Sequence, residues 1–139
     1  MRTKTISITA LVLVLLLLSL SVASAAPPSP FTGHWRAVDL DNSNVQLSIS
    51  GGGNGIYRLT QTDDDWGLCN GAPGIGRGVG TLHATEPILH TDLVFYCPSQ
   101  HIEVGFPFDF VYDADTDTLF QDYDHVQADG SITWDRVGP

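Results

Sequence analysis

The chain has 139 residues, of which 16 are acidic and 6 are basic, and its formal net charge at pH 7 is −10. This length accommodates one ordinary domain beside a leader and excludes two stacked domains. The negative charge repels phosphate backbones and anionic lipid surfaces, which excludes nucleic acid as a partner and argues against binding to a membrane surface.

Residues 1–26 have the three parts of an export signal. Two basic side chains stand near the N-terminus, residues 10–18 form an uninterrupted apolar run, and an Ala-Ser-Ala sequence at 23–25 offers the small residues that a signal peptidase accepts. An uncleaved anchor is the alternative, because residues 6–26 are about long enough to span a bilayer. We expect residues 1–26 to be a signal peptide that is removed.

Removal of the signal leaves about 113 residues, which keep all 16 acidic side chains and four of the six basic ones, so the net charge becomes −12. Residues 27–30 read Pro-Pro-Ser-Pro and predict a stiff spacer, and residues 31–139 are expected to form a single domain. Because an exported chain meets oxidising conditions, Cys69 and Cys97 are predicted to form a disulfide. The mature protein is expected to be secreted, or periplasmic in a Gram-negative host, without membrane contact.

Apolar residues of the mature chain recur with period two, and no helical period persists for three turns, which predicts strands throughout. Residues 63–80 are rich in glycine and aspartate and are expected to form the longest loop, with room for at most a short strand. Gly105 and Pro107 interrupt one expected strand and predict a bulge or bend there. The expected strands are residues 31–40, 45–50, 56–62, 79–84, 88–97, 101–112, 118–123 and 131–137.

Short turns join almost all of these segments. The sequence Asp41-Asn42-Ser43 predicts a hairpin between the first two, and Asp129-Gly130, between the last two, is the strongest hairpin signal in the chain. Hairpin-length connections favour antiparallel pairs of neighbouring strands. The eight strands are therefore expected to form an all-β up-and-down meander that closes into a barrel, with a two-sheet β-sandwich as the alternative.

The first expected strand carries Gly33-His34-Trp35, a G-x-W sequence, and on the last strand Arg136 lies two residues after Trp134. This pattern resembles the calycins, which include the lipocalins and the avidin-like proteins. The resemblance implies an eight-stranded barrel in which Trp35 closes one end and Arg136 covers the face of its indole. It also implies an interior that can hold one small ligand.

Four aromatic residues alternate along residues 106–112, so all four rings project from one face of the expected strand. Such a face forms either the packed core of a barrel or the wall of a cavity, and a wall of this kind suits a small apolar ligand. The candidate cavity residues on this strand and on others are Trp35, Tyr57, Leu59, Phe95, Phe106, Phe108, Phe110 and Tyr112.

Asp113, Asp115 and Asp117 have the alternate spacing of the oxygen ligands in a Ca²⁺ loop. Thr118 and Asp124 stand where an EF-hand has glycine and glutamate, and the flanking segments are expected strands. The alternative is a hairpin loop whose Asp and Thr side chains bond their own backbone. Both interpretations stay open from the sequence.

A second acidic cluster consists of the three adjacent aspartates at residues 63–65. Three neighbours on an extended chain cannot all point the same way, so a metal site would need a further ligand such as Asp41 or Asp92. The alternative is a solvated loop.

The five histidines have no spacing typical of zinc sites, and no nucleophile motif such as G-x-S-x-G is present. We therefore expect no enzyme and no cofactor other than Ca²⁺. The first hypothesis for function is a non-catalytic binding module for a small apolar ligand or an extracellular protein. The second is a packed extracellular interaction domain whose acidic loops bind either a basic partner or Ca²⁺.

Overall fold

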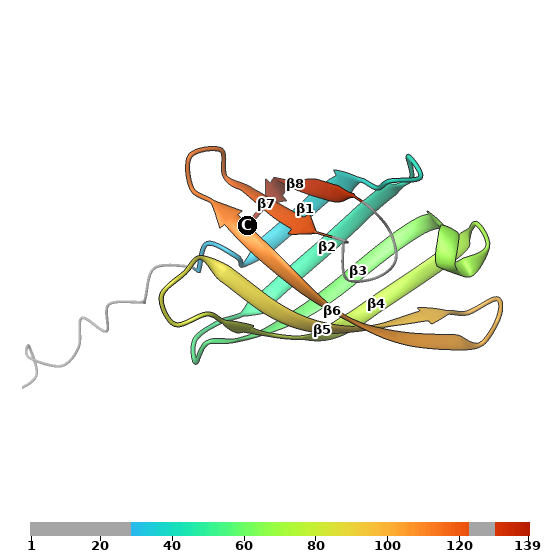
Figure 1. Cartoon of the computed structure of the whole chain (residues 1–139), viewed down its shortest axis with the longest axis horizontal. Helices are drawn as coiled ribbons and strands as arrows, with labels where there is room; N and C mark the ends of the chain where they lie inside the picture. The colour runs from blue at the N-terminus through green and yellow to red at the C-terminus, as the bar shows by residue number, and fades with distance from the viewer. Residues whose placement is uncertain (1–28, 123–129) are drawn as a thin grey trace, which may run out of the picture.

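The computed structural model describes residues 29–122 and 130–139, which fold into a closed antiparallel β-barrel (Figure 1). Each strand pairs with the next along the chain, and β8 pairs back with β1. This confirms the predicted meander barrel over the two-sheet sandwich. The strands are β1 (Gly33–Val38), β2 (Asn44–Gly51), β3 (Ile56–Trp66), β4 (Ala72–Leu82), β5 (Ile88–Cys97), β6 (Ile102–Asp113), β7 (Thr118–Asp122) and β8 (Ser131–Gly138), and a 3-10 turn, η1 (Gly67–Cys69), follows β3.

Three sequence predictions fall on residues that the structure does not describe. They are the export signal at residues 1–26, the first two residues of the spacer at 27–30, and Asp129 of the last predicted turn. In the described residues there is no helix that is long and apolar enough to span a bilayer.

The expectation of a long loop over residues 63–80 is wrong. β3 continues to Trp66 and β4 begins at Ala72, so only residues 67–71 connect the two strands. The glycines of β4 alternate along its inward face, and rings from neighbouring strands occupy the space beside Gly74 and Gly76. A Cβ added to Gly76 would lie 2.5 Å from the ring of Phe95, which explains why this position is glycine within a strand.

Of the bulge or bend predicted at Gly105 and Pro107, the bulge is absent from the pairing of β6 with β5. β6 pairs with β5 in one continuous register, whereas the irregularities occur between β1 and β8 and between β3 and β4. Both residues are exposed, and among the described residues β7 pairs with β6 from Phe110 to Asp113. Pro107 therefore lies outside the described β6–β7 pairing, and no described residue of β7 requires an N–H from it.

At one end, which we call the closed end, Phe31 covers the barrel interior. Its ring centroid lies 5.9 Å from those of Tyr57 and Tyr112, and its carbonyl oxygen accepts a hydrogen bond of 3.0 Å from Nε1 of Trp35. The guanidinium of Arg136 lies 4.0 Å from the centre of the Trp35 ring. The contact between Arg136 and the Trp35 ring that the calycin resemblance implied is therefore present.

The middle of the barrel is filled with side chains. Inward-facing residues such as Leu47, Leu59 and Leu93 are at most 2% exposed. The indole Nε1 of Trp134 donates a hydrogen bond of 2.9 Å to Oε1 of Gln121 within this core. Packing of this kind leaves space for a ligand only toward an end of the barrel.

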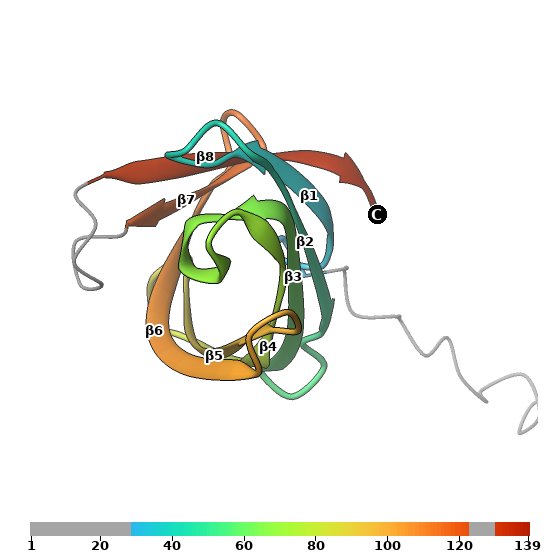
Figure 2. The same ribbon diagram turned by 90° about the vertical axis from the view of Figure 1, so that its right-hand side faces the viewer.

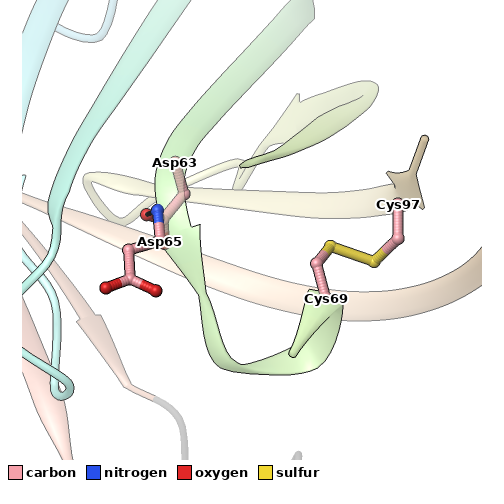
Figure 3. The surroundings of a disulfide bond; sticks show 4 residues. All are labelled: Asp63, Asp65, Cys69 and Cys97. Atoms are coloured by element: carbon pink, nitrogen blue, oxygen red, sulfur yellow. Dashed lines mark hydrogen bonds between the residues drawn. A yellow bond between two sulfur atoms is a disulfide. The ribbon is translucent and has the colours of Figure 1, made fainter. Parts of the chain in front are cut away.

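The opposite end, which we call the mouth, carries the connections at residues 39–43, 67–71 and 98–101, on the right of Figure 1. Figure 2 looks onto this end, where the strands form a closed ring and the η1 turn lies within its outline. A disulfide between Cys69 and Cys97, with a Cα–Cα distance of 5.3 Å, joins this turn to the end of β5 (Figure 3). The predicted pairing is confirmed.

Candidate functional site

A cavity of about 220 Å³ opens at the mouth. One side is formed by the β1–β2 connection, the floor by inward-facing residues of β3, β5 and β6, and the other side by the η1 turn. Leu40 and Leu68 contribute apolar side chains from the two connections. Because the η1 turn is tied to β5 by the disulfide, this side of the cavity is covalently fixed to the barrel wall.

The floor of the cavity is a cluster of four aromatic rings, from Trp66, Phe95, Phe106 and Phe108. The ring centroid of Phe95 lies 4.3 Å from that of Trp66, 5.8 Å from that of Phe108 and 5.9 Å from that of Phe106. Tilted and edge-to-face pairs of this kind stabilise one another by about 0.5–1.5 kcal/mol each. The apolar surface is therefore held in a defined shape.

Glycines of β4 create the space for these rings. A Cβ on Gly74 would clash with the ring of Trp66, and one on Gly76 would clash with the ring of Phe95. The glycine positions that made this segment look like a loop thus allow two rings to approach the backbone of β4 closely.

Gln61 lies beside the aromatic floor, and its Oε1 is buried without a hydrogen-bond partner among the described residues. The side chain is only 3% exposed. A buried acceptor left without a donor costs about 1–3 kcal/mol, so such atoms are rare in folded proteins and call for an explanation. A ligand that supplies the missing hydrogen bond is one.

Asp63 follows two residues later on the same inward face and is 2% exposed. Its Oδ1 accepts a hydrogen bond of 3.0 Å from the backbone N–H of Asp65, whereas its Oδ2 has no partner in the described part of the chain. Burial raises the pKa of the Asp63 carboxyl, and the nearby carboxylates of Asp41 and Asp64 add to the rise, whereas the hydrogen bond from the N–H of Asp65 and the side chain of Ser43 oppose it. The mouth thus contains a buried, incompletely satisfied carboxyl group.

Two more carboxyl groups, those of Asp39 and Asp41, line the cavity from the β1–β2 connection. Burial raises the pKa of Asp39, with added repulsion from Asp41 and Asp63. For Asp41, desolvation acts to raise the pKa, but hydrogen bonds from Ser43 and from the backbone of Gly67 outweigh it and lower the pKa. None of the described lining residues is basic.

The structure separates the eight cavity residues expected from the sequence into two groups. Phe95, Phe106 and Phe108 line the cavity at the mouth. The other five are packed in the core or at the closed end, where all but Tyr112 are at most 2% exposed. These five are Trp35, Tyr57, Leu59, Phe110 and Tyr112.

The aspartates at 113, 115 and 117 form a hairpin turn at the closed end. The carboxylate of Asp113 accepts hydrogen bonds from the N–H of Asp115, at 2.9 Å, and from Oγ1 of Thr116, at 2.8 Å. Asp117 instead pairs with Nε of Arg136 at 2.9 Å. Within the described residues, no three His, Cys, Asp or Glu side chains gather so that they could hold a metal ion.

The second acidic cluster also separates on folding. Asp63 points inward, whereas Asp64 and Asp65 are exposed. Of the two further ligands considered for it, Asp41 lies close enough to raise the pKa of Asp63, and Asp92 is exposed on β5. Its carboxylates thus contribute negative charge to the mouth.

Sequence reasoning did not assign Asp39, Gln61, Trp66 and Leu68 to a common site. They come from two connections and from the middle and the end of one strand, so no local spacing links them. The meander order itself could have placed them together, because alternate connections of an up-and-down barrel lie at the same end.

We expect Asp63→Asn to stabilise the protein by about 1 kcal/mol at pH 7, because it removes a buried charge and retains an oxygen for the N–H of Asp65. The raised pKa means that the folded state holds its proton more tightly than the unfolded chain does. Stability is thus lost as the pH rises from the unfolded to the folded pKa, and the advantage of the variant should vanish below both. Urea unfolding from pH 3 to 8 measures this, with exposed Asp64→Asn as control; a destabilised variant at pH 7 contradicts it.

In comparisons with known proteins, no family model, no curated protein and no solved structure matches the chain. The resemblance to calycins therefore extends to the closed eight-stranded barrel and to the contact of Arg136 with Trp35.

Proposed function

We propose that the protein is a non-catalytic binding module, exported from the cell, that holds the apolar part of a small ligand in the cavity at the barrel mouth. The observation that carries this proposal is the floor of four aromatic rings in an open cavity. Rings arranged in this way are the usual lining of small-molecule sites. The disulfide supports export, since such bonds persist in oxidising compartments.

The size of the cavity limits the ligand. A volume of about 220 Å³ is below the roughly 300–1,000 Å³ of pockets that enclose drug-sized molecules. The core behind the cavity is packed, so the ligand cannot extend along the barrel axis toward the closed end. We infer a compact ligand of about one ring, or a larger molecule that inserts one apolar group.

The proposal predicts that 2-phenylethanol, a neutral one-ring probe, binds at the mouth. Titration followed by NMR should shift the ring signals of Phe95, Phe106 and Phe108. Phe106→Ala should weaken binding at least about threefold, because it removes part of the floor where the side chain is only partly buried. The matched control is Phe120→Ala, which removes a ring that is 42% exposed on β7.

Equal affinity in the two variants, or no binding to the unsubstituted protein at millimolar probe, would contradict a site at the mouth. If millimolar Ca²⁺ raised the unfolding temperature while the probe did not, the hypothesis of an interaction domain with Ca²⁺-binding loops would be favoured instead.

A further inference from the structure

We propose that the ligand of the mouth is an organic cation, a protonated primary or secondary amine attached to a small apolar body. This assignment rests on the function proposed above and adds a charge and a hydrogen-bond donor to the ligand. The shape of the cavity and its aromatic floor select the apolar body, and three further observations select the ammonium group.

The first observation is the sign of the charge around the cavity. Asp39 and Asp41 line it, and the buried Asp63 lies close enough to both to repel them. Arginines in the described residues lie elsewhere: Arg136 is at the closed end, and the others are exposed on the outer faces of strands. A cation is attracted to this end of the barrel, and an anion is repelled from it.

The second observation is the unused hydrogen-bonding capacity at the cavity. Oε1 of Gln61 is a buried acceptor in the cavity wall. This oxygen has no hydrogen-bond partner among the described residues. An ammonium group with N–H bonds can donate to such an acceptor, whereas a quaternary ammonium carries charge but no donor.

The third observation is that the charge and the rings occur together. Trp66 and three phenylalanines form the floor below the two lining carboxylates. Ring faces attract cations by about 0.5–2 kcal/mol, with the larger values where water is excluded. A bare metal ion would not use the rings, and the described carboxylates do not gather into a metal site. An organic cation uses the carboxylates, the amide oxygen and the rings at once.

The test compares three one-ring probes of similar size: 2-phenylethylammonium, 2-phenylethanol and 3-phenylpropionate. Isothermal titration at pH 7 and low salt should give about tenfold tighter binding for the ammonium than for the alcohol, and the weakest binding for the carboxylate. The preference for the ammonium should shrink at about 0.3 M salt, because salt screens partly exposed charges. N,N,N-trimethyl-2-phenylethylammonium should bind several-fold more weakly than the primary amine.

Variants test the assigned atoms. Asp39→Asn and Asp41→Asn should each weaken binding of the ammonium about twofold to fivefold and leave binding of the alcohol unchanged. Asp115→Asn changes the net charge equally at the closed end, in the β6–β7 turn, and should leave both affinities unchanged. Gln61→Leu should weaken the primary amine but not the trimethyl probe. Circular dichroism checks that each variant is folded.

Each outcome decides between the two proposals. If the alcohol binds as tightly as the ammonium, or if Asp115→Asn weakens the ammonium as much as Asp39→Asn does, the cation assignment is overturned while the apolar site stands. If no probe binds, or if Phe106→Ala affects every probe no more than Phe120→Ala does, the mouth site itself is wrong. Tightest binding of the carboxylate would reverse the inferred charge of the ligand.

Discussion

Replacement of Trp35 by alanine is expected to lower the free energy of unfolding by about 3–5 kcal/mol, the range found for large aromatic side chains in packed cores. The side chain is 1% exposed and stands between Phe31, whose carbonyl oxygen it binds, and the guanidinium of Arg136. The substitution therefore opens a cavity, removes a buried hydrogen bond and leaves the guanidinium without its ring at the same time.

Unfolding in guanidinium chloride, followed by far-UV circular dichroism, measures this effect, and Trp66 and Trp134 remain as fluorescent reporters. Because the alanine variant could be too unstable to purify, Trp35→Phe is the second variant. It retains most of the buried ring but loses the N–H that binds the Phe31 carbonyl, so a loss of about 1–2 kcal/mol is expected.

Arg136→Gln separates the cation from the ring that it covers. It removes the contact with Trp35 and the ion pair with Asp117, which is half exposed and contributes little. We expect its free energy of unfolding to fall by about 1–2 kcal/mol, mostly through loss of the cation–π contact and of the hydrogen bond to the Thr32 carbonyl.

For the first prediction, a fall below 1 kcal/mol in Trp35→Ala would show that the closed end does not hold the barrel together.

The strand order was predictable from the sequence because it depends on local signals. Period-two alternation, as in Val45 to Ser50, indicates which face of a strand is buried, and short polar turns indicate that neighbours pair. The contact between Trp35 and Arg136, 101 residues apart in the chain, could be expected only from the resemblance to calycins. Nothing in the local sequence of either residue links the two.

β4 shows where local signals fail. Its alternating glycines, Gly74 to Gly80, lower the intrinsic preference for a strand, so the segment looked like a loop. In the barrel, the rings of Trp66 and Phe95 occupy the space that β4 lacks side chains to fill, and full pairing with β3 and β5 satisfies its backbone. The strand is thus stabilised by residues of β3 and β5, which the sequence of residues 72–82 alone does not reveal.

Only the part of the candidate site that depends on local spacing could be predicted from the sequence. Phe106 and Phe108 were found because two alternate positions on one strand always share a face. Gln61 looked like an ordinary polar residue at the end of a strand, and only the closed barrel shows that its amide oxygen is buried without a partner. An unsatisfied acceptor is a property of the assembled structure, and its cost is what makes it informative about a ligand.

Removal of the disulfide is expected to destabilise the protein by about 3.5 kcal/mol, a large part of the roughly 5–15 kcal/mol of an ordinary domain. Cys69 and Cys97 are 28 residues apart, and the bond lowers the conformational entropy of the unfolded chain by closing this loop. Both side chains are 0% exposed, so Cys69→Ala with Cys97→Ala is preferred to serine, whose hydroxyl groups would be buried without partners.

The bond also has a local consequence at the mouth. Its loop includes all of β4 and β5, and Cys69 ends the η1 turn whose Gly67 and Leu68 form one side of the cavity. Without the bond, this turn is held by backbone hydrogen bonds such as that from Gly71 N–H to the Trp66 carbonyl, at 3.0 Å. We therefore expect the double variant to bind 2-phenylethanol more weakly even under conditions where circular dichroism shows the barrel to be folded.

Urea unfolding with and without dithiothreitol separates the covalent constraint from the effect of substitution. The unsubstituted protein should lose about 3.5 kcal/mol on reduction, and the double alanine variant should not respond to the reductant at all. On reduction, hydrogen exchange should accelerate more in residues 67–71 than in β1 and β8. The reason is that, of these segments, only residues 67–71 depend on the bond for their attachment to the barrel wall. If reduction left stability within 1 kcal/mol and exchange at the turn unchanged, the barrel contacts alone would position this side of the cavity.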